Sequence, residues 1–155
     1  MLNVENLDVW FGHDPDRVAA VTSAAFSVAP GESFGLVGES GSGKSTILRA
    51  IAGLIDSWSG RIEVAGKPVA GSRRDRAFYK TVQMVFQDPY ASLNPRWRVR
   101  ETVGDPLLAF GLARGRADMR EQVGRLLTDV GIEPEDAEKY PHEFYGGQRQ
   151  RIAIA

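Results

Sequence analysis

A glycine-rich octapeptide at residues 38–45 constrains this 155-residue chain more than any other feature. It reads Gly-Glu-Ser-Gly-Ser-Gly-Lys-Ser and matches the pattern G-x-x-x-x-G-K-[ST]. Residues 33–37 before it form a short apolar run that is typical of a buried strand. After it, apolar residues recur at helical spacing between 47 and 54, and the helix is predicted to end near Gly53. The pattern therefore predicts a strand, a loop and a helix in direct succession.

The residue types of this loop suit the binding of a nucleotide phosphate. Glycines permit positive φ, so that successive backbone N–H groups can turn toward phosphate oxygens. The helix that follows directs the partial positive charge of its N-terminus at the same anion. Lys44 supplies a point charge for the β- and γ-phosphates, and the Ser45 hydroxyl is placed to ligate Mg²⁺. The predicted binding residues are Gly38, Glu39, Ser40, Gly41, Ser42, Gly43, Lys44, Ser45 and Thr46.

Short patterned segments elsewhere predict a mixed α/β chain, beginning with an antiparallel hairpin or small sheet. The predicted strands are residues 2–11, 18–28, 33–37, 61–65 and 81–86. The predicted helices are residues 47–54, 116–130 with Gly131 at the end, and a helix start at 148–155. The last helical pattern stops without a cap or a polar tail, so we expect the chain to be truncated.

Composition excludes several classes of protein. Hydrophobic residues make up 43% and charged residues 25% of the chain, as in soluble globular proteins. The formal net charge of -1 argues against a nucleic-acid partner bound through bulk positive charge. The absence of Cys from the sequence excludes disulfides and Cys-based zinc sites. No apolar run approaches the roughly 18 residues of a membrane span, and the N-terminus lacks the pattern of a secretion signal.

Two further motifs narrow the family. Residues 85–89 read Val-Phe-Gln-Asp-Pro, and residues 144–151 read Phe-Tyr-Gly-Gly-Gln-Arg-Gln-Arg. With the glycine-rich loop, they resemble the nucleotide-binding domain of ABC transporters. Residues 85–96 and 140–144 look like the ATPase subunits of oligopeptide, dipeptide and nickel importers. Residues 146–148, Gly-Gly-Gln, match the signature sequence of that family and argue against a P-loop kinase of small substrates. The importer-like stretch at 88–96 makes ABC-type repair ATPases and ribosome-associated ATPases less fitting.

The resemblance implies an α/β fold: a P-loop NTPase core with an antiparallel β subdomain and an inserted helical subdomain, the C-terminal part of the core missing. It implies a core with the β subdomain at 1–89, a helical subdomain at 90–147 and the start of the signature helix at 148–155. In the family, the Walker B strand, the catalytic glutamate and the switch histidine follow that helix. We therefore expect this chain to bind ATP with little or no turnover.

The resemblance also assigns site residues. Phe11 takes the place of an aromatic residue that stacks on adenine, with Trp10 as a competing candidate. Gln87 matches a glutamine that contacts Mg²⁺ and the attacking water. Lys44 and Gln87 are thus the implied catalytic residues, and Ser45 and Gln87 the implied metal ligands. The residues implied to bind the γ-phosphate of ATP on an opposite subunit are Tyr145, Gly146, Gly147 and Gln148.

The implied function is that of an ATP-binding subunit of an ABC importer, which couples MgATP binding and hydrolysis to uptake of peptides or a related small solute. The alternative is a non-hydrolysing nucleotide-binding or interaction fragment that lacks Walker B. The implied partners are a second nucleotide-binding subunit, like or unlike, and membrane permease subunits near residues 88–96, with no nucleic acid. The implied location is cytoplasmic, peripheral on the inner face of the cell membrane. His13 and His142 are expected to be surface or loop residues.

One residue departs from the family pattern, which usually has Ser before the two signature glycines where this chain has Tyr145. A tyrosine ring carries its hydroxyl beyond the reach of a serine and adds bulk where two subunits must close. Tyr145→Ser is therefore expected to raise ATP-dependent dimerisation of a completed domain, measured by sedimentation equilibrium. An unchanged dimerisation constant would contradict this expectation.

Overall fold

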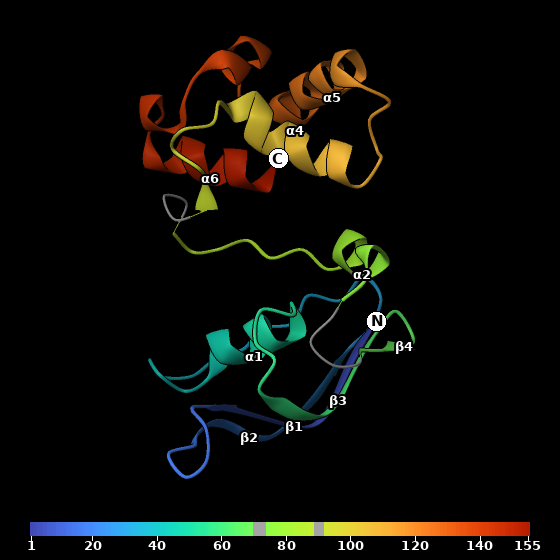
Figure 1. Cartoon of the computed structure of the whole chain (residues 1–155), viewed down its shortest axis with the longest axis vertical. Coiled ribbons are helices and arrows are strands. Elements are labelled where there is room, and N and C mark those ends of the chain that lie inside the picture. Colours follow the sequence, from blue (N-terminus) through green and yellow to red (C-terminus); the bar gives the residue numbers. More distant parts are fainter. Residues whose placement is uncertain (70–73, 89–91) are drawn as a thin grey trace. The chain divides into compact units, whose positions relative to one another are not determined.

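The computed structural model describes residues 1–69, 74–88 and 92–155, which form two compact units (Figure 1). Unit 1 comprises Met1–Gln83 and unit 2 comprises Met84–Ala155. The predicted boundary between residues 89 and 90 lies outside the described residues, so it stays a prediction.

Unit 1 is built on an antiparallel sheet in the strand order β2-β1-β3-β4 (Figure 1). Its strands are β1 (Leu2–Phe11), β2 (Val18–Val28), β3 (Trp58–Val64) and β4 (Lys67–Pro68). The structure confirms the predicted hairpin at 2–28 and the strand predicted at 61–65, which begins earlier, at Trp58. The register of β1 against β2 passes from Val9–Val21 to Trp10–Ala19, so Ala20 is the extra residue of a bulge.

Helix α1 (Lys44–Ile51) packs on the sheet and closes the core of unit 1, as the spacing of its apolar residues predicts. It contributes Ile47, Ala50 and Ile51, which are buried together with residues of the strands. The strand members of this core are Val4, Leu7, Val9, Val21 and Ile62. Burying one such aliphatic side chain is worth about 1.5–3 kcal/mol, so the core holds the start of α1 close to β2. The second helix, α2 (Arg76–Thr81), follows the sheet.

Two predicted strands are wrong. Residues 33–37 are not in a strand, and the Val37 side chain is 96% exposed. Thr81 ends α2, and residues 82–86 are irregular chain (Figure 1). An apolar run becomes a strand only where a neighbour accepts its ladder hydrogen bonds, and none of the described strands pairs with either segment. Phe34 instead stacks on Phe26 of β2, with the ring centroids 5.0 Å apart.

Unit 2 is helical, and much of the core that its described residues form lies on three α-helices. These are α4 (Val99–Ala109), α5 (Arg116–Asp129) and α6 (Gly146–Ile154), with short 3₁₀ turns η1 (Pro134–Glu138) and η2 (Pro141–Glu143). Buried residues recur every fourth position on two of them: Val99, Val103 and Leu107 on α4, and Met119, Val123 and Leu127 on α5. The structure confirms the helices predicted at 116–130 and 148–155, whereas α4 was not predicted.

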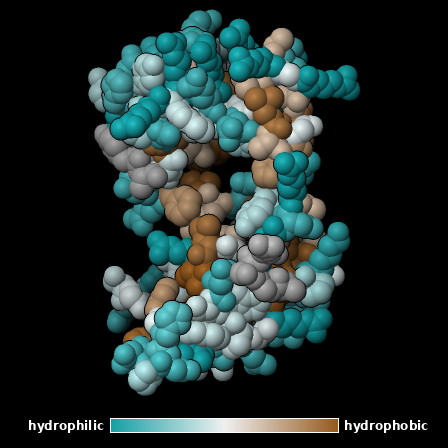
Figure 2. Space-filling view, in the orientation of Figure 1, coloured by the Kyte–Doolittle hydropathy of each residue, from teal (hydrophilic) through white to brown (hydrophobic). Residues whose placement is uncertain are grey.

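Hydrophilic residues cover most of the face in Figure 2, and some hydrophobic groups also reach the surface. In the part of the chain that the structure describes, every helix is too short or too polar to cross a bilayer.

Candidate phosphate-binding site

The glycine-rich loop leads directly into α1. Gly41 and Gly43 adopt positive φ angles of 82° and 88°, which side chains other than glycine rarely tolerate. Gly43 is the N-cap of α1, and its carbonyl accepts the first helical hydrogen bond, from the Ile47 N–H (2.9 Å). The N–H groups of residues 44–46 therefore precede the helical ladder. The structure thus confirms the loop and the helix of the motif, but not the strand before them.

Gly43 fixes where the loop lies in unit 1. A Cβ atom at this position would be 2.8 Å from the Ala20 carbonyl oxygen and 3.0 Å from Val21 Cγ2. Ala20 is the bulge residue of β2, so the start of α1 lies directly against the bulge. Only glycine fits both this contact and the positive φ.

The Lys44 side chain reaches back across the loop. Its ammonium group donates to the carbonyl oxygens of Gly38 (2.8 Å) and Glu39 (2.6 Å) and to Ser42 Oγ (3.3 Å). One cation, the positive φ glycines and the amino end of α1 therefore share one loop. The first turn of α1 contains no acidic residue that would oppose an anion.

These residues fit the phosphates of a nucleotide. Loop residues 38–42 and Ser45 are exposed, so an anion can reach the backbone N–H groups and the Ser45 hydroxyl. That hydroxyl is an oxygen ligand of the kind that Mg²⁺ accepts. The predicted second metal ligand, Gln87, is exposed and belongs to unit 2. Ser45 belongs to unit 1, so a metal shared by Ser45 and Gln87 stays a prediction.

The aromatic candidates for base stacking differ in what covers them. The guanidinium carbon of Arg17 lies 3.5 Å from the ring centroid of Trp10 and so covers one face of that ring. Phe11 is 48% exposed. By strand alternation Phe11 lies on the same side of β1 as Val9, whose partner Val21 is next to Gly43. The geometry therefore favours Phe11 over Trp10, and the covering Arg17 was not anticipated from the sequence.

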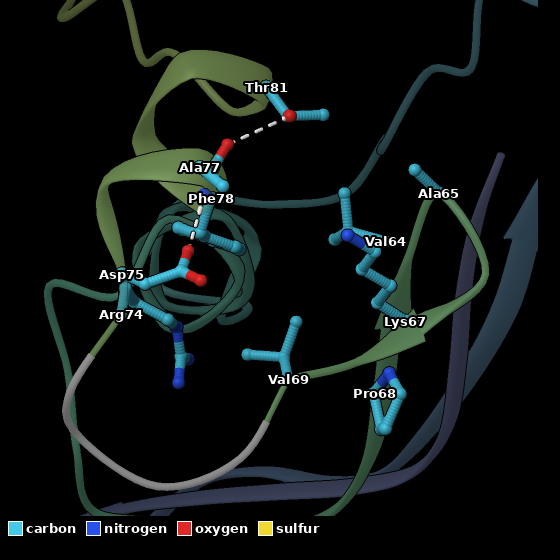
Figure 3. Close-up of a pocket in the computed structure, with 10 residues that line it drawn as sticks. All are labelled: Val64, Ala65, Lys67, Pro68, Val69, Arg74, Asp75, Ala77, Phe78 and Thr81. Carbon is cyan, nitrogen blue, oxygen red and sulfur yellow. Dashed lines mark hydrogen bonds between the residues drawn. The ribbon is translucent and has the colours of Figure 1, made fainter. Parts of the chain in front are cut away.

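Unit 1 also contains a hollow of about 310 Å³ (Figure 3). It is lined by the β3–β4 hairpin, by α2 and by the adjoining residues Val69, Arg74 and Asp75, and no residue of 38–46 is among the lining residues. Asp75 Oδ1 accepts a hydrogen bond from the Phe78 N–H (2.7 Å), and Arg74 donates to the Ala50 carbonyl (3.3 Å). Burial lowers the pKa of the Arg74 guanidinium. These charged side chains serve the local fold, so we do not assign the phosphate to this hollow.

In unit 2, the predicted signature residues lie at the amino end of α6. Tyr145 is the N-cap, its side chain is 85% exposed, and its N–H donates to Gln148 Oε1 (3.0 Å). A Cβ atom on Gly146 or Gly147 would meet no described atom within 4 Å. The first turn contains no acidic residue. The four predicted residues are therefore together at one helix end, with open space around the two glycines.

The segment around Gln87 contacts the same helix. The Gln150 side chain of α6 donates to the Phe86 carbonyl at 3.5 Å, a long hydrogen bond. Residues 89–91 of the predicted partner segment 88–96 lie outside the described residues. His13 and His142 are both exposed, and among the described residues no cluster of three His, Cys, Asp or Glu side chains could hold a metal.

Comparison with known proteins identifies the family of this chain. The family model described as "ABC transporter" matches residues 21–155. The oligopeptide transport ATP-binding protein OppF of Streptococcus pyogenes serotype M1 is 42% identical over 100% of this chain and 52% of its own length. OppF of Escherichia coli is 43% identical over 94% of this chain and 44% of its own length. The di/tripeptide transport protein DppF of Pseudomonas aeruginosa is 44% identical over 90% and 43%. The chain thus spans about half the length of these relatives.

Solved structures agree with the relatives. The dimeric bacterial ABC transporter cassette MJ0796 has a TM-score of 0.81 and 26% identity, over 99% of this chain and 67% of its own. A dimeric post-hydrolysis structure of MJ0796 bound to ADP and phosphate has a TM-score of 0.80. The family match over residues 21–155, the relatives and the fold lead to one conclusion: the chain belongs to the ABC transporter family.

Proposed function

We propose that this chain is the nucleotide-holding part of an ATP-binding subunit of an ABC importer. The observation that carries the proposal is the loop at 38–45, where Lys44 and the amino end of α1 meet. The named peptide-transport relatives support uptake of peptides or a related small solute. Membrane permease subunits as partners and a position on the cytoplasmic face of the membrane belong to the same proposal.

Each residue of the proposed site has a distinct task. The backbone N–H groups of the loop and of the first turn of α1 hold phosphate oxygens. The Lys44 ammonium would donate to phosphate oxygens in place of the loop oxygens, and Ser45 and Gln87 would be the residues that hold Mg²⁺. Bound Mg²⁺ supplies positive charge for the β- and γ-phosphates. Phe11 stacks on the adenine ring. Hydrolysis is assigned to the whole subunit, and Lys44 and Gln87 are the residues of this chain that take part in it.

A second copy of this chain, or a related subunit, would bind the amino end of α6, where the signature residues lie. Glycine costs a helix roughly 0.5–1 kcal/mol relative to alanine, and Gly146 and Gly147 have neither a positive φ nor a crowded neighbour to require it. Close approach of an outside group explains both glycines. The dimeric MJ0796 structures support such a pairing. In the proposed pair, the residues that bind the γ-phosphate held by the partner are Tyr145, Gly146, Gly147 and Gln148.

Removal of the Lys44 charge tests whether the loop at 38–45 binds the phosphates of MgATP. Lys44→Ala is expected to weaken MgATP binding between about 10-fold and 150-fold, because a hydrogen bond to a charged group is worth about 1.5–3 kcal/mol. Titration calorimetry measures the change. Lys80→Ala, which removes an exposed lysine of α2, serves as the matched control and should bind as the unaltered chain does. Equal affinity of both variants would refute the proposal.

Removal of the Phe11 ring separates base recognition from phosphate recognition. Phe11→Ala is expected to weaken ATP binding by about fivefold or more, because stacking of a base is worth about 1–3 kcal/mol. Binding of inorganic triphosphate should stay unchanged, and Phe11→Tyr, which keeps the ring, should bind ATP normally. A larger loss in Trp10→Ala than in Phe11→Ala would transfer the stacking role to Trp10.

A further inference from the structure

Two arginines hold α6 to neighbouring segments of unit 2 through backbone carbonyls. Arg149 donates from Nε to the Pro141 carbonyl (2.6 Å) and from Nη2 to the His142 carbonyl (3.2 Å). Arg151 donates from Nη1 to the Val130 carbonyl (3.1 Å) and to the Gly131 carbonyl (2.7 Å). Both arginines follow the signature glycines on the same short helix, and each contacts a different segment.

Arg151 contacts the carboxyl end of α5. The last carbonyls of a helix have no partner within the helix, and they carry the negative end of its dipole. A guanidinium group satisfies them with charge-assisted hydrogen bonds. Gly131, which follows this end with φ of 69°, also leaves room for the contact, since a Cβ atom there would lie 2.9 Å from Arg151 Nη1.

These contacts determine the direction in which the amino end of α6 points. Ile152 is 2% exposed and anchors the helix in the core, and Ala153 packs against the same cluster. Such small apolar contacts are not directional, so the hydrogen bonds of the arginines add the restraint on rotation of the helix about its axis. The two arginines restrict that rotation from two further sides. We call the hydrogen bonds of Arg151 to Val130 and Gly131 the Arg151 clamp. Gly146 and Arg151 are five residues apart, so at 1.5 Å per residue this clamp lies only about 7.5 Å along the helix from the signature amides.

We infer that Arg151 is a positioning residue for the signature: by capping α5, it aims the N–H groups of Gly146–Gln148 at a phosphate held by a second subunit. The inference rests on the proposed function, because the phosphate and the second subunit come from it. Arg151 does not itself touch the nucleotide in this account. Its effect is confined to binding in trans, whereas the loop at 38–45 binds in cis.

Arg151 is a better test than Arg149 because of its surroundings. Arg149 is 6% exposed, so its removal would disturb the core of unit 2 as well as the direction of α6. Arg151 is exposed, so Arg151→Ala removes the clamp and leaves the core in place. Arg125 on α5 offers a matched control, because its side chain is 71% exposed and forms an ion pair with Glu121 on the same helix, one turn away.

The experiment compares the unaltered 155-residue chain with Arg151→Ala, Arg151→Lys and Arg125→Ala. Titration calorimetry gives the MgATP dissociation constant, and sedimentation equilibrium with MgATP gives the dimerisation constant. Arg151→Ala should weaken dimerisation between about 10-fold and 100-fold, the scale of a misplacement by about 1 Å, and change the MgATP constant less than twofold. Arg151→Lys, which keeps a cationic donor, should recover most of the loss, and Arg125→Ala should behave as the unaltered chain.

The possible results separate this inference from the proposed function. Unchanged dimerisation in Arg151→Ala overturns the inference, as does an equal loss of MgATP binding and dimerisation, which would indicate general damage. A chain that binds MgATP but forms no dimer also overturns it and leaves the phosphate-binding loop standing. Failure of the unaltered chain to bind MgATP overturns the proposed function itself.

Discussion

The contact between Gly43 and the bulge of β2 is the constraint on which the phosphate-binding loop depends. It brings the amino end of α1 against Ala20 and Val21, while Ile47 and Ile51 bury the same helix in the sheet. A side chain at position 43 would strike the Ala20 carbonyl, so the loop could not keep this place. The contact thereby sets the place, relative to β2, of the N–H groups of residues 44–46, which precede the helical ladder.

The amino end of α6 in unit 2 shares with α1 the features that suit a helix end to an anion. Both helices begin without an acidic residue in the first turn, and glycine is the N-cap of α1 and occupies the first two positions of α6. They differ in how the helix is held. Helix α1 is fixed by apolar packing and one crowded glycine, whereas α6 is fixed by Ile152 and by arginines that donate to carbonyls. In the proposed account, the first end serves its own nucleotide and the second serves that of a partner.

Local signals in the sequence predict the elements that depend on local physics. The hairpin at 2–28, helix α1 and helix α5 follow from apolar spacing and from turn residues such as Gly131. Residues 33–37 and 81–86 were mispredicted because strand formation requires a partner that an apolar run cannot reveal. The site motif was likewise readable, but the bulge at Ala20, the cover of Arg17 on Trp10 and the clamp of Arg151 are tertiary contacts without a local pattern.

Amide hydrogen exchange with and without MgATP tests the central claim most directly, because it reports on the backbone N–H groups themselves. We expect slower exchange for residues 38–47 when MgATP is present, and no such protection in Lys44→Ala at the same nucleotide concentration. Saturating MgATP that leaves residues 38–47 unprotected, or that protects only the hollow between β4 and α2, would contradict the account.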